Sequence, residues 1–398
     1  MPSINPGIPR TLAAALRQRA TQYPVVTLTG PRQAGKTTLA RAAFPGHAYV
    51  SLEQPDQREF ALADGRGFIA SLPKGGVILD EVQRVPMLPS WLQGVVDGDP
   101  RPGRFILTGS HAFELMASIT QSLAGRTALL NLLPLSLAEL RAGGIELATD
   151  RLIFAGGYPR IHAEHLDPTV ALGDYFATYV ERDLRQLIEL RQLEAFRRFV
   201  RMAAGRVGQL LNLQSLASDV GVSGHTAKAW LGLLEASFIV RRLEPWFANL
   251  GKRLVKTPKL YFCDTGLAAW LIGITDASQL ATHPLRGALF ENLVVMEFVK
   301  HALHAGHRVG LNFYRDSSGL EIDLVVEQGM PAGRVGLVEV KSSRTVHGEH
   351  LRPVQRVREL LSEKVERCML VHDGDEHYLR EGVEVVGLHA IGSAQSAP

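Results

Sequence analysis

The chain has 398 residues, and because single hydrophobic cores seldom grow beyond roughly 250–300 residues, this length predicts two or three cores. Its net charge of +3 does not by itself indicate nucleic-acid binding, and Cys263 and Cys368 are too few and too far apart for a disulfide framework or a zinc site. No apolar run approaches the roughly 20 residues that span a bilayer, and the N-terminus has no signal-peptide core, so we expect a cytoplasmic protein without membrane contact.

The first predicted element is a buried strand that runs into a phosphate-binding loop. Residues 25–29 are apolar or Thr, and residues 30–37 match Gly-x-x-x-x-Gly-Lys-Thr. The glycines let loop N–H groups point at a β-phosphate, and a helix over residues 36–44 adds the positive end of its dipole. We expect Lys36 to contact the β- and γ-phosphate oxygens and Thr37 to hold Mg²⁺. The predicted nucleoside triphosphate site comprises Gly30, Pro31, Arg32, Gln33, Ala34, Gly35, Lys36, Thr37 and Thr38.

Two further strands supply the polar groups that complete such a site. The apolar stretch before Asp80 and Glu81 predicts a buried strand, with Asp80 helping to hold Mg²⁺ and Glu81 acting as the base toward the attacking water. Residues 104–110 predict another strand that ends in Thr108 and Ser110. Since the C-terminal ends of parallel strands meet at one edge, either hydroxyl is a candidate sensor of the γ-phosphate.

These motifs resemble those of a prokaryotic AAA+ family ATPase of uncharacterised biological role. The resemblance implies a parallel-sheet P-loop core, ATP and Mg²⁺ as ligands, and a homo-oligomer. It also implies an arginine near the γ-phosphate, often from a neighbouring subunit, for which Arg126 and Arg182 are candidates. Each arginine has the alternative of bracing a helix through a carboxylate. The residues that carry the resemblance are 30–37, 80–86, 107–110, 122–126, 133–140 and 156–159.

The middle third is predicted to be helical and to contain a winged helix. Residues 172–204 have helical spacing, residues 213–235 have a helix-turn-helix pattern, and strand-like segments follow. Such a wing can lie along a phosphate backbone, with DNA the favoured partner. The alternative is a lid or a protein-contact surface. The groove-facing candidates are Ser223, His225, Thr226 and Lys228, and the wing, with a local charge of +5, contains Arg241, Arg242, Glu244, Lys252, Arg253, Lys256 and Lys259.

The last third carries a second candidate site. Glu291 lies near the start of an amphipathic helix, Asp323 and Glu339 lie within predicted strands, and Lys341 shares a face with Glu339. Carboxylates and a lysine that converge on a sheet can bind Mg²⁺ and activate water for phosphodiester attack. The arrangement resembles the restriction-endonuclease-like fold, in which Gln355 would take an accessory position. The alternatives are a structural salt-bridge network and a former nuclease that only binds.

The sequence therefore predicts an α/β protein in three parts with a short tail. These are a P-loop AAA+ core at residues 1–165, a helical and winged-helix part at 166–284, a small mixed α/β nuclease-like domain at 285–390 and the tail at 391–398. The predicted function is Mg²⁺-dependent ATP hydrolysis that acts on nucleic acid or is regulated by it. The alternatives are an ATP-gated binding switch with slow turnover and a metal-dependent nuclease regulated by its ATPase core.

Overall fold

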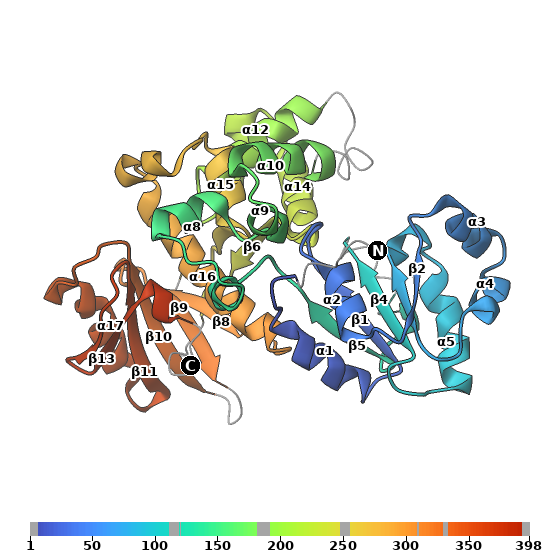
Figure 1. The fold of residues 1–398 in the computed structure, drawn as a ribbon. Helices are drawn as coiled ribbons and strands as arrows, with labels where there is room; N and C mark the ends of the chain where they lie inside the picture. Colours follow the sequence, from blue (N-terminus) through green and yellow to red (C-terminus); the bar gives the residue numbers. More distant parts are fainter. Residues whose placement is uncertain are drawn as a thin grey trace. The chain divides into compact units, whose positions relative to one another are not determined.

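The computed structural model in Figure 1 describes residues 7–110, 119, 121–180, 192–246, 255–308, 310–328 and 333–391. The chain divides into two compact units. Unit 1 comprises Met1–Leu135, Ala236–Phe238 and Ala302–Arg308, and unit 2 comprises Ser136–Glu235, Ile239–His301 and Val309–Pro398. Within the described ranges, no helix is both long enough and apolar enough to cross a bilayer. The predicted boundaries near residues 165, 284 and 390 stay predictions.

Unit 1 is built on a five-stranded parallel sheet with strand order β2-β3-β4-β1-β5. The strand that precedes the phosphate loop therefore lies inside the sheet, next to the strand that carries Thr108. This arrangement is the predicted P-loop AAA+ core, and the three strands expected from apolar runs are present. The strands are β1 (Val25–Thr29), β2 (Ala48–Ser51), β3 (Val77–Asp80), β4 (Phe105–Gly109) and β5 (Thr127–Asn131).

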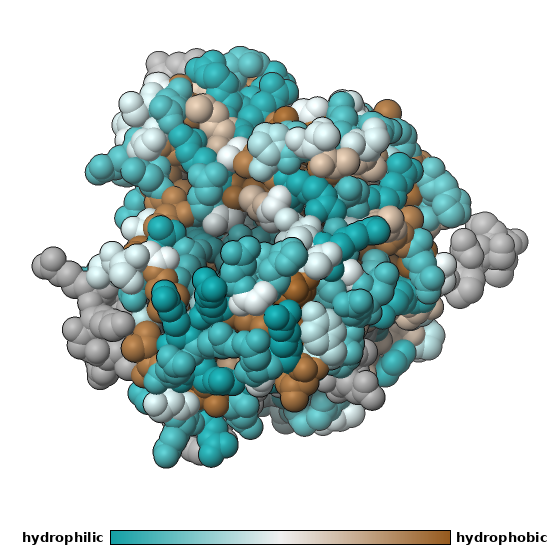
Figure 2. Space-filling model, turned by 90° about the vertical axis from the view of Figure 1, so that its left-hand side faces the viewer, coloured by the Kyte–Doolittle hydropathy of each residue, from teal (hydrophilic) through white to brown (hydrophobic). Residues whose placement is uncertain are grey.

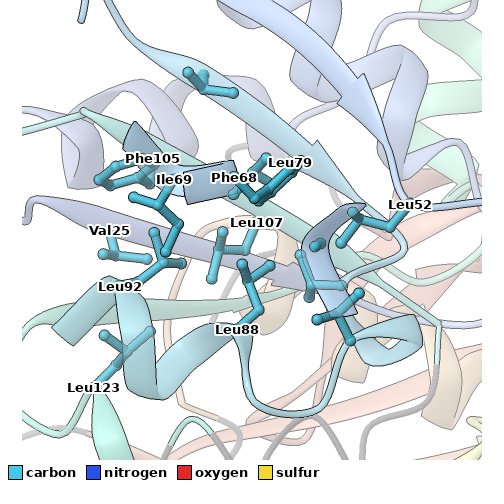
Figure 3. Close-up of a cluster of buried hydrophobic side chains, with 14 of the residues drawn as sticks. Val25, Leu52, Phe68, Ile69, Leu79, Leu88, Leu92, Phe105, Leu107 and Leu123 are labelled. Carbon is cyan, nitrogen blue, oxygen red and sulfur yellow. The ribbon is translucent and has the colours of Figure 1, made fainter. Parts of the chain in front are cut away.

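Alternate residues of these strands face two separate hydrophobic cores. On strand β3, Val77 and Leu79 join one core while Ile78 joins the other. Because both faces are covered by helices, the strands read as continuous apolar runs rather than as alternating patterns. Helices α1 (Leu12–Ala20) and α2 (Lys36–Ala43) cover one face. The other core, shown in Figure 3, contains side chains from α3 (Pro55–Ala63), α4 (Gly65–Ser71) and α5 (Leu88–Gly98).

The first part of unit 2 is helical. Its helices are α7 (Leu137–Ala142), α8 (Thr149–Ala155), α9 (Pro159–Ala163), α10 (Pro168–Tyr175), α12 (Leu193–Ala204), α13 (Leu213–Val220), α14 (Gly224–Ala236) and α15 (Thr265–Leu271). Gly221, with φ +82°, ends α13 and turns the chain toward α14, as the helix-turn-helix pattern predicts. Strands β6 (Val240–Leu243) and β7 (Lys259–Phe262) then pair antiparallel.

A six-stranded mixed sheet forms the C-terminal part of unit 2, in the order β12-β13-β11-β10-β9-β8. Strands β8, β9 and β10 pair antiparallel, whereas β11 runs parallel to β10, so the predicted mixed α/β architecture is confirmed. The one face of the chain that Figure 2 draws is mainly hydrophilic and carries small hydrophobic patches. The elements are α16 (Arg286–His304), β8 (Leu311–Arg315), β9 (Glu321–Gln328), β10 (Arg334–Lys341), α17 (Gly348–Leu361), β11 (Val365–His372), β12 (His377–Arg380) and β13 (Val383–Gly387).

Candidate functional sites

The phosphate loop joins β1 to α2 in a conformation that needs its two glycines. Gly30 has φ +150°, and a Cβ atom there would lie 2.0 Å from the carbonyl oxygen of Leu132. Gly35 has φ +89° and precedes the first residue of α2. Both backbones lie in the region that side chains disfavour, so the loop geometry accounts for the glycine spacing of the motif.

The side chain of Lys36 is buried over this loop. Its Nζ atom donates hydrogen bonds to the carbonyl oxygens of Gly30, at 2.9 Å, and Pro31, at 2.7 Å. Burial lowers the pKa of Lys36 to about 8, although the nearby Glu81 and Asp80 carboxylates act in the opposite direction. The ammonium group therefore lies on loop carbonyls that phosphate oxygens can replace.

Arginines also hold the loop. Arg10 donates from Nη1 to the carbonyl oxygen of Ala34 and from Nη2 to that of Leu133, both at 2.6 Å. Arg32 Nη1 lies 3.9 Å from Glu53 Oε1. Sequence reasoning missed Arg10, because it precedes the motif by twenty residues and belongs to no recognisable pattern.

The Asp80 carboxylate accepts hydrogen bonds from hydroxyl groups of three other elements of unit 1. Thr37 Oγ1 lies 3.1 and 3.0 Å from its two carboxylate oxygens, Tyr49 donates to Oδ2 at 2.7 Å, and Thr108 donates to Oδ1. Burial and the hydrogen bond to Asp80 raise the pKa of Tyr49 to about 12. The sequence predicted the proximity of Thr37 and Asp80 but missed Tyr49, because β2 is short and only partly buried.

Glu81 follows Asp80 in a left-handed backbone conformation with φ +57°. Such a conformation costs a residue with a side chain on the order of 1–3 kcal/mol and is common at functional sites. Ser110 Oγ donates to Glu81 Oε2 at 3.1 Å, and the side-chain amide of Gln83 donates to both Glu81 and Ser110. The two sensor candidates are thus separated, since Thr108 contacts Asp80 and Ser110 contacts Glu81.

The donor set at this edge fits a magnesium ion. Hard cations such as Mg²⁺ take oxygen ligands, and the Thr37 hydroxyl and the Asp80 carboxylate supply oxygen atoms side by side. The roles assigned to these residues stay predictions.

Of the two arginine-finger candidates, the structure describes Arg126, which lies away from the phosphate loop of its own chain. Arg126 comes just before β5 and pairs with Asp97, at 2.5 Å from Nε to Oδ1. It therefore lies at the start of the parallel strands, whereas the phosphate loop lies at their C-terminal edge. A role for Arg126 in a neighbouring subunit stays a prediction. Arg182 lies outside the described residues.

The predicted basic wing needs a correction, because Lys259 does not face solvent. Its side chain is buried among carboxylates, so counting it toward a phosphate-binding surface was wrong. Arg242 pairs with Glu235 at 2.7 Å, and Lys256 is exposed. Lys252 and Arg253 fall outside the described residues, and Arg241 is partly buried.

The helix-turn-helix candidates lie at the start of α14. Ser223, His225 and Lys228 are exposed, and Thr226 is half-buried. Ser223 Oγ accepts a hydrogen bond from the Thr226 backbone N–H at 3.0 Å, as an N-cap side chain does.

A cluster of carboxylates surrounds Lys259. Its Nζ atom lies 2.9 Å from Glu291 Oε1, 2.5 Å from Glu321 Oε1 and 3.4 Å from Asp323 Oδ1. Tyr261 also donates to Glu291 at 2.5 Å. The predicted convergence of Glu291 and Asp323 is present, but sequence reasoning missed both Lys259 and Glu321 as members.

Glu339 and Lys341 complete the cluster. Lys341 Nζ lies 2.5 Å from Glu339 Oε1, as the strand alternation predicts, while Glu339 Oε2 is buried without a hydrogen-bond partner. Burial, with a further contribution from Asp323, raises the pKa of Glu291 to about 7 and that of Glu339 to about 8. Gln355 instead donates to Glu381 at 2.7 Å.

This cluster does not fit a divalent cation as it stands. Among the described residues, no group of three or more His, Cys, Asp or Glu side chains is arranged to hold a metal ion. The oxygens of Glu291, Glu321 and Asp323 that would serve as ligands contact the Lys259 ammonium instead.

Comparison with known proteins identifies sequence relatives along most of the chain. Residues 22–141 match the AAA domain family, and residues 147–278 and 286–391 match two domains of unknown function, DUF8612 and DUF4143. Uncharacterized proteins of Mycobacterium tuberculosis and Mycobacterium bovis are each 37% identical over 340 residues, which cover 84% of this chain and 74% of the relative.

Solved structures resemble the chain more distantly. The Walker-type ATPase of Pyrococcus abyssi is 17% identical and aligns over 65% of this chain and 94% of its own, with a TM-score of 0.42. DnaA from Aquifex aeolicus, solved with bound AMPPCP, is 15% identical over 56% of this chain and 85% of its own, with a TM-score of 0.27.

Proposed function

We propose that this chain, which belongs to the same family as its two mycobacterial relatives and has an AAA-type P-loop ATPase core, binds and hydrolyses ATP with Mg²⁺. The observation that carries the proposal is the convergence of Lys36, Thr37, Asp80 and Glu81 at one edge of the sheet. Three separate elements, α2, β2 and β4, bring the side chains that contact Asp80 to this edge.

The phosphates would lie against the loop between β1 and α2. Lys36 would exchange its carbonyl partners for β- and γ-phosphate oxygens, and Thr37 with Asp80 would hold the metal. When bound, Mg²⁺ neutralises charge on the phosphate oxygens. Tyr49 and Thr108 orient the Asp80 carboxylate from two sides.

Glu81 would orient the attacking water and accept its proton. Its left-handed backbone and its contacts with Ser110 and Gln83 hold the carboxylate in one position beside the phosphate loop. Ser110 and Gln83 act as positioning residues in this proposal, since they touch the base.

The test compares steady-state ATP hydrolysis and equilibrium ATP binding in three variants. Lys36→Ala should lose ATP binding, because it removes the cation that contacts the β- and γ-phosphates. Glu81→Gln should bind ATP normally and hydrolyse it about 10²–10⁴ times more slowly. Glu59→Gln, an exposed glutamate of α3, is the matched control and should behave as the wild type. Equal loss of binding in Lys36→Ala and Glu81→Gln would contradict these roles.

We further propose that the helix-turn-helix and the β6–β7 pair form a winged helix that contacts DNA. The exposed Ser223, His225 and Lys228 at the start of α14 favour this second function, since this end of a recognition helix lies in the major groove, where a lysine also reaches the phosphates that flank it. Lys228→Ala should weaken binding to a mixed-sequence duplex and reduce the log–log salt slope by about 0.9. Lys74→Ala, which changes an exposed lysine of unit 1, is the control and should leave the slope unchanged. An unchanged slope in Lys228→Ala would refute DNA contact at the start of α14.

We also propose a restriction-endonuclease-like fold for the C-terminal part. The succession of α16, the antiparallel β8–β9–β10, α17 and the parallel β11 supports this resemblance. A nuclease would need a divalent ion beside Asp323 and Glu339, and the position of Lys259 argues against one.

A further inference from the structure

Lys259 is a cation that the chain itself inserts among the carboxylates of the C-terminal sheet. It comes from β7, whereas its partners come from α16 and β9. Its side chain is only 4% exposed, and the ammonium also lies 5.6 Å from the ring centre of Phe313. Burial alone would disfavour the charged lysine, but the three carboxylates reverse that effect and raise its pKa.

The charge balance of the cluster leaves little attraction for a second cation. Arg315 Nη1 lies 2.7 Å from Glu321 Oε2, and Lys341 neutralises Glu339. The Val340 backbone N–H donates to the remaining oxygen of Asp323 at 2.9 Å. The four carboxylates Glu291, Glu321, Asp323 and Glu339 therefore face the three cations Lys259, Arg315 and Lys341. With all four carboxylates ionised one net negative charge remains, and the raised pKa values of Glu291 and Glu339 lower that charge further near pH 7, so the cluster has too little negative charge to balance a divalent ion.

Backbone contacts hold Lys259 in this position. In the β6–β7 pair it lies opposite Leu243, and on its other side it bridges to Leu210. Three residues further on, the Asn292 side chain of α16 accepts from the Phe262 N–H at 2.7 Å and donates to the Phe262 carbonyl at 2.9 Å. The strand that carries Lys259 is thus fixed to the helix that carries Glu291, so the base of the lysine side chain is held beside the cluster.

We infer that Lys259 is the permanent cation of the cluster, which ties β7 to α16 and β9 and binds no divalent ion in the intact chain. Such a cation differs from an ordinary salt-bridge partner in what its removal should do. If the ammonium takes the place that a metal ion would need, removing it leaves converging carboxylates without a cation, and these should then bind a divalent ion.

The first test measures Mn²⁺ binding to the full-length protein without nucleotide, by electron paramagnetic resonance. Wild type and Asp323→Asn should bind the same number of Mn²⁺ ions, since Asp323 holds none and the phosphate loop is unchanged in both. One additional ion in the wild type, lost in Asp323→Asn, would overturn the inference.

The second test removes the internal cation. Lys259→Met should gain one Mn²⁺ ion and a melting temperature that rises with Mn²⁺, and both effects should disappear in Lys259→Met/Asp323→Asn. The exposed Lys256→Met is the matched control and should show neither effect. A folded Lys259→Met that gains no ion would overturn the inference.

Lys259→Met leaves buried carboxylates unpaired and is expected to melt at a lower temperature than the wild type. If it does not fold, Lys259→Met/Glu291→Gln should be more stable, because it removes one carboxylate together with the cation. A double variant no more stable than Lys259→Met would overturn the assignment of Lys259 as the counter-ion of Glu291.

Discussion

The buried Lys36 predicts that ATP binding depends on pH above neutrality. Without nucleotide, burial lowers the pKa of its ammonium group to about 8, so raising the pH from 7 to 9 removes most of its charge. Phosphate oxygens favour the charged lysine, which means that ATP binding raises this pKa and takes up a proton.

The magnitude follows from the two protonation states. If only the ammonium form binds ATP, the neutral fraction is about 10% at pH 7, half at pH 8 and about 90% at pH 9, so Kd should rise about tenfold from pH 7 to pH 9. Proton uptake at pH 8 should be about half a proton per ATP bound.

Isothermal titration calorimetry in buffers of different ionisation enthalpy measures both quantities. Lys36→Met, which carries no titratable group, should bind weakly and without this pH dependence. A wild-type Kd that is constant from pH 7 to pH 9, with no proton uptake, would refute the reasoning.

Three substitutions test other parts of the structure. Gly30→Ala places a Cβ atom 2.0 Å from the Leu132 carbonyl oxygen, so calorimetry should show that the free energy of unfolding falls by an amount near the upper end of about 1–3 kcal/mol, and ATP should bind more weakly. Gly94→Ala is the control, because a Cβ atom there meets nothing within 4 Å, and it should show neither effect. Tyr49→Phe removes a hydrogen-bond donor to Asp80, and water can replace this donor because Tyr49 is partly exposed. The Mg²⁺ concentration for half-maximal hydrolysis should therefore rise by less than about tenfold, and in the control Tyr23→Phe this concentration should not change. Asp264→Ala leaves the backbone N–H groups of Gly157 and Leu267 buried without an acceptor, and each unpaired group destabilises the fold by about 1–3 kcal/mol. The melting temperature should therefore fall well below that of the control Asp174→Ala, which changes an exposed residue. A melting temperature equal to that of Asp174→Ala would contradict the burial argument.

The nucleotide edge of unit 1 could be predicted because its polar residues lie directly beside recognisable apolar runs in the sequence. The strand before Gly30 and the strand before Asp80 are buried on both faces, so both appear as apolar runs next to the polar residues that they position. Parallel pairing then brings Thr108 beside Asp80 without further information. Tyr49 could not be found in this way, since its strand is short and half-exposed and gives no hydrophobic pattern.

Lys259 shows where charge counting along the sequence fails. Its basic neighbours suggested a phosphate-binding wing, but its carboxylate partners lie 32 to 64 residues further along the chain. Only the tertiary pairing of β6 with β7, and of β7 with α16, turns this side chain inward. Strand alternation predicted the contact of Glu339 with Lys341 because those residues are two positions apart on one strand.

The identity of the nucleotide retained by Glu81→Gln tests the proposed hydrolysis most directly. The variant is incubated with ATP and Mg²⁺, separated from free nucleotide, and its bound nucleotide is analysed. We expect bound ATP, because the phosphate loop, Lys36, Thr37 and Asp80 are intact while the base is missing. Bound ADP would show that hydrolysis proceeds without Glu81 and would contradict the account.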